Sequence, residues 1–208
     1  VRKSFKAKAT PIPTLPRTTK IVFKSKPTIF KAINNPIVII IKVDTFEKFN
    51  SAIQDSFRYD DEIIIEQYIK GREIECAILG NDPVEASNPG EIIISERYDF
   101  YSFDAKYVDP EAVKIQVPAV LSGDLTSKIK SASIQAFNVL RCQDFARVDL
   151  FVTEDRILVN EINTIPGFTK ISMYPKLWEA SGIPYTELID RLIQLAIERH
   201  RRECKLRT

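Results

Sequence analysis

The sequence predicts an α+β protein in which antiparallel sheets are flanked by helices. Two apolar runs, 145–152 and 157–162, are separated by the polar residues 153–156, which have the length and chemistry of a hairpin loop. Other stretches repeat apolar residues at helical spacing, and short runs rich in Ile, Val and Tyr lie between them. Together these patterns favour a sheet built partly from hairpins and covered by amphipathic helices.

Further strands are predicted from short runs of β-branched and aromatic residues. These runs are 37–43, 62–69, 73–79 and 91–95. The second and third, on either side of Gly71, are predicted to form two adjoining strands. A turn over 80–83 follows them, because Gly, Asn, Asp and Pro favour turn backbone.

Three amphipathic helices are predicted. Their ranges are 46–57, 125–140 and 185–200. Thr45 and Asp124 stand where the N-caps of the first two would lie, since their side-chain oxygens can accept a backbone N–H. We expect the second helix to pack on a sheet.

No stretch of the sequence predicts a membrane span. The longest apolar run, 36–41, ends at Lys42, well short of the ~20 residues that a spanning helix requires. The basic N-terminal residues are not followed by an apolar stretch of roughly 7 to 15 residues, so they do not form a secretory signal. The cysteines Cys76, Cys142 and Cys204 share no metal-type spacing. We therefore expect a cytoplasmic protein with reduced thiols.

Charge is distributed unevenly along the chain. Residues 1–43 contain ten Lys or Arg and no Asp or Glu, whereas the rest has twenty against twenty-eight. Five prolines within residues 1–36 predict extended, partly irregular backbone. Few aromatic residues accompany the basic ones, so nucleic-acid binding is disfavoured. We predict a divergent basic segment over 1–43, a small lobe over 44–70 and a large lobe over 71–208.

Four polar side chains of the hairpin are expected to converge. Residues two apart in a strand share a face, so Arg147 joins Asp149 on the first strand and Glu161 joins Asn163 on the second. Antiparallel pairing through the four-residue loop places Asp149 opposite roughly residue 160, which brings the two pairs close together.

Oxygen donors of this kind suit magnesium, which takes one or two carboxylates together with phosphate oxygens and water. The site would therefore bind a phosphate-bearing ligand, and Arg147 could bind a phosphate or a developing anion. The alternative is a solvated, salt-bridged sheet face of little energetic value. In the loop 163–168 that follows, the Gly167 N–H could face an oxyanion, although such a loop can also be only a turn.

The run ARVDLFVTEDRILVNEINTIPGFTKISMYPK, residues 146–176, closely resembles the C-terminal signature of the D-alanine-D-alanine ligases, members of the ATP-grasp superfamily. Three segments extend the match upstream: GREIECAILGNDPVEAS at 71–87, PGEI at 89–92 and FDAKY at 103–107. The resemblance covers about residues 44–200. It implies an ATP-grasp fold without the family's N-terminal domain, with a remnant of the small lobe and the large catalytic lobe.

The resemblance also implies which metal ions the protein binds and which reaction it catalyses. Asp149, Glu161 and Asn163 would ligate two magnesium or manganese ions that hold the ATP phosphates, with Glu161 bridging them. ATP would phosphorylate the carboxylate of one D-alanine, and the amine of a second would attack the acyl phosphate. The product, D-alanyl-D-alanine, would serve peptidoglycan precursor synthesis.

The same resemblance assigns the remaining groups. Arg147, Gly167 and Lys106 would stabilise charge during catalysis, since no protein nucleophile is needed. Substrate would be bound by Ser172, Asn163 and Gly167, with Ser172 on the carboxylate of the second D-alanine. Simpler roles stay open for Lys106 as a surface lysine and for Ser172 as a helix cap.

ATP would be bound by residues from both lobes. Glu73 would hold the ribose hydroxyls, or it is an exposed strand residue. The other implied contacts are Lys31 and Lys106 on the phosphates, and the adenine hinge EQYI, which is Glu66, Gln67, Tyr68 and Ile69.

The N-terminal part departs from the family pattern. The family covers the ATP phosphates with a Gly/Ser loop, whereas residues 31–43 read KAINNPIVIIIKV and no glycine occurs before Gly71. Such a segment is poorly suited to cradle phosphate through backbone N–H groups. The family's N-terminal domain would then either be absent, as in a fragment or degraded gene copy, or come from another chain.

Three functions follow from these observations. The first is ligation of two D-alanines with ATP, in a homodimer. The second is a truncated, inactive ATP-grasp remnant that binds a nucleotide or a partner. The third is an ATP-grasp ligase with a different amine or acid substrate, which the ISMYP and GREIE segments disfavour.

Overall fold

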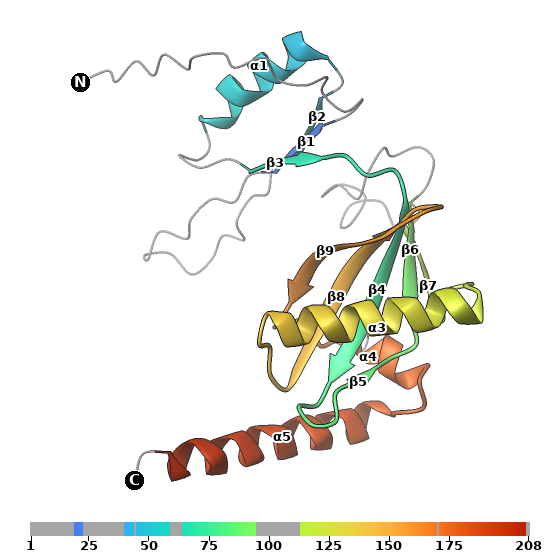
Figure 1. The fold of residues 1–208 in the computed structure, drawn as a ribbon, viewed down its shortest axis with the longest axis vertical. Coiled ribbons are helices and arrows are strands. Elements are labelled where there is room, and N and C mark those ends of the chain that lie inside the picture. The colour runs from blue at the N-terminus through green and yellow to red at the C-terminus, as the bar shows by residue number, and fades with distance from the viewer. Residues whose placement is uncertain are drawn as a thin grey trace. The chain divides into compact units, whose positions relative to one another are not determined.

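The computed structural model describes residues 19–22, 40–43, 45–58, 64–94, 113–169 and 171–206. The chain divides into two compact units, Val1–Ile69 and Lys70–Thr208. Figure 1 shows the helices and strands of each unit. The candidate hairpin site belongs entirely to the second unit.

In its described part, the first unit contains a three-stranded antiparallel sheet and one helix. Its elements are β1 (Thr19–Val22), β2 (Ile40–Val43), α1 (Phe46–Ser56) and β3 (Ile64–Gln67). β1 lies between β2 and β3. Thr45 caps α1, because its side chain accepts a hydrogen bond from the Lys48 N–H at 3.3 Å. The predicted strands at 37–43 and 62–69 and the predicted helix at 46–57 are confirmed, with shorter strands.

The second unit is built on a six-stranded sheet. Its strands are β4 (Arg72–Leu79), β5 (Glu85–Ala86), β6 (Gly90–Ile94), β7 (Val113–Gln116), β8 (Phe145–Val152) and β9 (Ile157–Asn163). Their order is β7-β6-β4-β8-β9, all antiparallel, with β5 paired to β4. The predicted hairpin is therefore confirmed as β8 and β9. The prediction that 62–69 and 73–79 form adjoining strands is wrong, because β3 and β4 belong to different sheets.

Helices cover both faces of this sheet (Figure 1). They are α3 (Gly123–Val139), α4 (Met173–Glu179) and α5 (Tyr185–Lys205). On one face, Ile129 and Phe137 of α3 pack on even-numbered residues of β4 and β8, such as Ile74 and Val148. This confirms that the second predicted helix packs on a sheet.

The opposite face is covered only in part. Tyr174, Leu177 and Trp178 of α4 and Leu188 of α5 form one buried cluster with the end of β4 that contains Ala77 and Leu79. Side chains along β8 point alternately to the two faces of the sheet. Every second residue of β8 therefore faces α3 and is buried. The odd-numbered residues of β4 and β8 that lie beyond the α4 cluster are where the polar side chains gather.

The N-cap of α3 is Ser122, so the prediction of Asp124 as the cap is wrong. Ser122 has extended backbone, and its side chain accepts a hydrogen bond from the Leu125 N–H at 3.2 Å. Asp124 lies inside the first turn and forms an ion pair with Lys128 at 2.7 Å on the surface. There it interacts favourably with the helix dipole, but it cannot cap the helix.

Replacing Ser122 by alanine is expected to lower the free energy of unfolding by about 1 kcal/mol, because the Leu125 N–H in the first turn of α3 loses its acceptor. Replacing Asp124 by alanine removes only a dipole contact and an exposed ion pair, which together are worth about 0.5 kcal/mol. Urea unfolding of both variants followed by circular dichroism measures the difference. A larger loss for Asp124→Ala than for Ser122→Ala would contradict the assignment of the cap.

The cysteines are free, and one is deeply buried. Cys76, Cys142 and Cys204 form no disulfide. Burial raises the pKa of the Cys76 thiol to about 11, so this thiol stays protonated as a core residue. Within the described ranges, no helix is long and apolar enough to cross a membrane.

Candidate active site

The hairpin brings four polar side chains onto one face of the sheet. Arg147 is paired directly with Asn163, and Asp149 directly with Glu161. Directly opposed residues of an antiparallel pair project to the same side. Because Val148 and its even-numbered neighbours face α3, these four side chains lie on the opposite face. The predicted convergence of the two pairs is confirmed.

The partner of Asp149, predicted at roughly residue 160, is Glu161, and a β-bulge explains the difference of one residue. Leu150 is paired with Val159, but Asp149 is paired with Glu161, so Asn160 is an extra residue in β9. In a regular ladder Asn160 would oppose Asp149, and Glu161 would oppose Val148 on the α3 face. The bulge therefore places both carboxylates on the same face. Its signal in the sequence is the apolar spacing of residues 157, 159 and 162, which strict alternation does not allow.

Arg147 and Asp149 form a two-point contact. The guanidinium donates from Nε to Oδ1 and from Nη2 to Oδ2 of Asp149, each at 2.7 Å. Burial opposes the charge of Arg147, but its hydrogen bond to Asp149 and the charges of Glu75, Asp149 and Glu161 outweigh burial and raise its pKa. Arg147 is therefore a permanent cation at the centre of three carboxylates.

Glu75 is a site residue for which the sequence analysis predicted no role. It lies on β4 directly opposite Asp149, and its Oε2 is 3.1 Å from Arg147 Nε. Glu75 is only 5% exposed in a strand that is otherwise mostly apolar. A buried glutamate is rare unless it is paired. That single acidic residue within the run IECAIL was the signal that could have identified it.

The oxygen donors fit the chemistry of magnesium. Asp149 and Glu161 supply two carboxylates that are opposed across the strands, and Glu161 is exposed. Asn163 adds an amide oxygen, which also accepts a hydrogen bond from the Ile165 N–H at 3.1 Å. A magnesium ion needs few protein ligands when phosphate and water complete its shell. Among the described residues, no group of three or more His, Cys, Asp or Glu side chains forms a metal cage.

The loop after β9 is held by Ser172. Its hydroxyl accepts a hydrogen bond from the Thr169 N–H at 3.0 Å and lies 2.8 Å from the Thr169 hydroxyl. Ser172 occupies the N-cap position of α4, but its side chain makes no capping hydrogen bond. A Cβ at Gly167 would lie 3.1 Å from Ser172 Oγ, so close approach of these two residues favours glycine there.

Aromatic residues anchor the other side of this loop. The Tyr185 hydroxyl donates to the Phe168 carbonyl oxygen at 2.9 Å. The Phe168 ring lies 5.6 Å from the Tyr185 ring and 5.7 Å from the Tyr174 ring, measured between centroids. The Gly167 backbone is thus placed between two fixed points, Asn163 and the α4–α5 core.

The predicted ATP contacts are distributed over several parts of the chain. Glu73 lies on β4 two residues before Glu75, so it projects from the same face of the sheet. The hinge residues 66–69 lie at the end of β3 and just beyond it, in the first unit. Lys31 and Lys106 lie outside the described residues.

The fold and these side chains define a class of protein, the ligases with an ATP-grasp fold. The described elements match the C-terminal part of such ligase structures. A family model described as D-ala D-ala ligase C-terminus matches residues 26–194. The chain therefore belongs to this family.

Similar proteins agree with this membership. The chain is 50% identical over 170 residues to D-alanine-D-alanine ligase A of Escherichia coli O6:H1, which covers 81% of this chain and 46% of that protein. It is 52% identical over 168 residues to the D-alanine-D-alanine ligase of Shouchella clausii, covering 80% and 45%. The chain thus spans about half the length of the curated relatives that it matches.

Solved structures show the same fold. The D-alanine-D-alanine ligase from Coxiella burnetii matches with a TM-score of 0.70 and 42% identity, over 90% of this chain and 47% of that one. The VanG D-Ala:D-Ser ligase from Enterococcus faecalis matches with a TM-score of 0.67 and 30% identity, over 88% and 57%. The Bacillus anthracis ligase complexed with ATP matches with a TM-score of 0.65 and 31% identity, over 79% and 52%.

Proposed function

We propose that this chain is the ATP- and metal-binding catalytic half of a D-alanine-D-alanine ligase, working through an acyl phosphate to supply D-alanyl-D-alanine for peptidoglycan. The observation that carries the proposal is the convergence of Arg147, Asp149, Glu161 and Asn163 on one face of the sheet. Family membership supports ATP as co-substrate, because one related structure holds ATP.

Two divalent cations, magnesium or manganese, would be held by Asp149, Glu161 and Asn163. When bound, such ions shield the negative charge of ATP phosphates and of the transferring phosphoryl group. The chain itself supplies oxygen ligands on two paired strands, so the backbone positions of these residues are fixed before the metal binds.

Other groups of the chain would act on the amino acids. Arg147 is a permanent cation beside the metal ligands, so it would stabilise negative charge that develops when the second amine attacks. The Gly167 N–H, in a loop held at Ser172 and Phe168, would donate to the same oxyanion. Ser172 would orient the carboxylate of the second D-alanine, and it would exchange its bond to Thr169 for that contact.

Further residues would contact ATP, as the family resemblance implies. Glu73 would bind the ribose hydroxyls, the hinge Glu66, Gln67, Tyr68 and Ile69 would bind adenine, and Lys31 and Lys106 would contact phosphate. We also propose that the protein works in the cytoplasm as a homodimer. This assignment implies a functional division of the chain into a basic segment over 1–43, a small lobe over 44–70 and a large lobe over 71–208.

Phosphate release from magnesium-ATP tests the proposal. The purified chain is assayed alone, with D-alanine, and with D-alanine plus D-serine, using Asp149→Asn as the inactive control. D-alanine should stimulate release several-fold, and the variant should lose the stimulated part. ATP binding without release stimulated by D-alanine, alone or with D-serine, would refute the ligase proposal and favour the alternative of a nucleotide- or partner-binding module.

A further inference from the structure

The strand β4 places one more carboxylate against the centre of the hairpin site. We propose that Glu75 is a positioning residue that holds the Arg147 guanidinium while a divalent cation takes the Asp149 carboxylate. The inference rests on the proposed function, because it concerns the same metal site. Glu75 itself touches neither the cation nor the substrate in this proposal.

Burial shows that Glu75 is built into the site. Its side chain is 7% exposed, and that of Arg147 is 17% exposed. Taking a carboxylate out of water is costly unless a cation compensates it. The guanidinium of Arg147 does so, with 3.1 Å between Arg147 Nε and Glu75 Oε2.

Arg147 and a metal ion compete for the same oxygens. Both oxygens of Asp149 accept hydrogen bonds from Arg147, so a cation that binds Asp149 must draw it away from the guanidinium. Without another anion, the guanidinium would lose its partner in a mostly buried place, which opposes metal binding. Glu75 lies on the neighbouring strand within reach of Nε, so the guanidinium keeps an ion pair when Asp149 turns to the metal.

Charge supports the same role. Arg147 carries one positive charge, and Glu75, Asp149 and Glu161 carry three negative charges around it. The cluster therefore has a net formal charge of −2, which favours the binding of divalent cations. Without Glu75 the net charge would be −1, and Arg147 would bind Asp149 alone.

Calorimetric titration with a non-hydrolysable ATP analogue tests this role without measuring activity. Each protein is titrated with the analogue in Mn²⁺ and in EDTA, and the ratio of the two affinities gives the contribution of the metal. Glu75→Gln keeps the size of the side chain but removes its charge. We expect this ratio to fall on the order of 10-fold, equal to about 1.4 kcal/mol.

A double variant separates positioning from structural damage. Glu75→Gln combined with Arg147→Met removes the buried pair as a whole and restores the net charge of −2, so the metal contribution should return to within about threefold of the wild type. Glu91→Gln is the matched control. It breaks another buried carboxylate-arginine pair, with Arg72 at 2.6 Å, on the opposite face of the same sheet.

The possible results have distinct meanings. A reduced ratio in Glu75→Gln, recovery in the double variant and no change in Glu91→Gln would support the inference. An unchanged ratio in Glu75→Gln, or a double variant as weak as the single one, would overturn it. If Glu75→Gln does not fold, the double variant alone tests the inference. A metal contribution within about threefold of the wild type then supports it, and a weaker one overturns it. If the wild-type protein binds the analogue equally well in Mn²⁺ and in EDTA, the proposed metal site is wrong, and this inference fails with it.

Discussion

Replacing Asp149 by asparagine, or Glu161 by glutamine, is expected to abolish magnesium-dependent nucleotide binding. Each change removes one negative charge and one ligand oxygen from the face where the two residues are paired. Near a doubly charged ion such a loss weakens binding on the order of 100-fold or more. The measurement is the affinity for ATP in the presence of magnesium and in EDTA, by calorimetry. Only the magnesium-dependent part should be lost.

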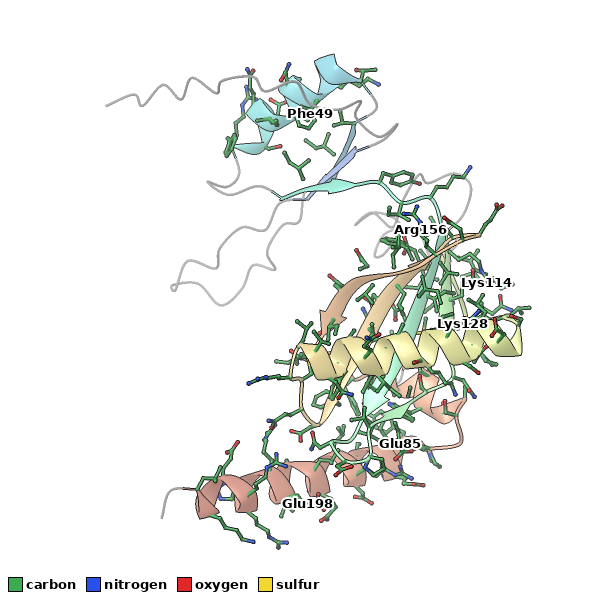
Figure 2. All side chains as sticks on the ribbon, in the orientation of Figure 1. Phe49, Glu85, Lys114, Lys128, Arg156 and Glu198 are labelled. Atoms are coloured by element: carbon green, nitrogen blue, oxygen red, sulfur yellow. The ribbon has the colours of Figure 1, made fainter. Side chains whose placement is uncertain are left out.

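Glu154→Gln is the matched control for this experiment. Glu154 is an exposed residue of the loop between β8 and β9, the loop marked by Arg156 in Figure 2. The same chemical change is made there on the same hairpin, but outside the site, so affinity should not change. Unfolding curves of the variants establish that the fold is retained. ATP affinity in magnesium that is unchanged in both Asp149→Asn and Glu161→Gln would remove the basis of the metal site.

Replacing Phe137 by alanine is expected to lower the free energy of unfolding of the second unit by about 3 to 5 kcal/mol. The Phe137 side chain is 1% exposed and packs between α3 and the sheet, where its removal leaves a cavity among rigid neighbours. A loss of this size is a large fraction of the roughly 5 to 15 kcal/mol that stabilises a domain. Urea unfolding followed by circular dichroism measures it.

Val139→Ala serves as the comparison for Phe137→Ala. Val139 lies on the same helix, two residues away, but it is 73% exposed. Its truncation should change stability by no more than about 0.5 kcal/mol. Similar losses in the two variants would contradict the packing of α3 on the sheet, since only one of the two side chains contributes to that interface.

Most of the fold of the second unit followed from local patterns. Apolar alternation and the four-residue loop identified β8 and β9 to within one residue, because hairpin pairing is set by neighbours in the chain. Helical spacing identified α3 and α5, although α5 extends to Lys205, five residues beyond the predicted end. Its basic last turn interacts well with the helix dipole, so the helix continues where apolar spacing no longer indicates it.

The sequence by itself determined the class of this protein and the residues of its candidate site. Arg147, Asp149, Glu161 and Asn163 are polar residues at strand positions within a family signature, and both features are properties of the chain read in order. It also determined that donors on each strand share a face, because side-chain alternation is local.

Only the tertiary structure decided how these residues meet. The bulge at Asn160 places Glu161 opposite Asp149, although the regular register would turn it toward α3. Pairing of β4 with β8 adds Glu75, which is 72 positions before Arg147 in the sequence and 3.1 Å from it in space. Strand order depends on contacts between distant segments and on burial of a shared core, and no local pattern contains that information. The apolar spacing of residues 157, 159 and 162 indicates an irregularity in β9, but the pairing with β8 fixes the residue at which the bulge lies.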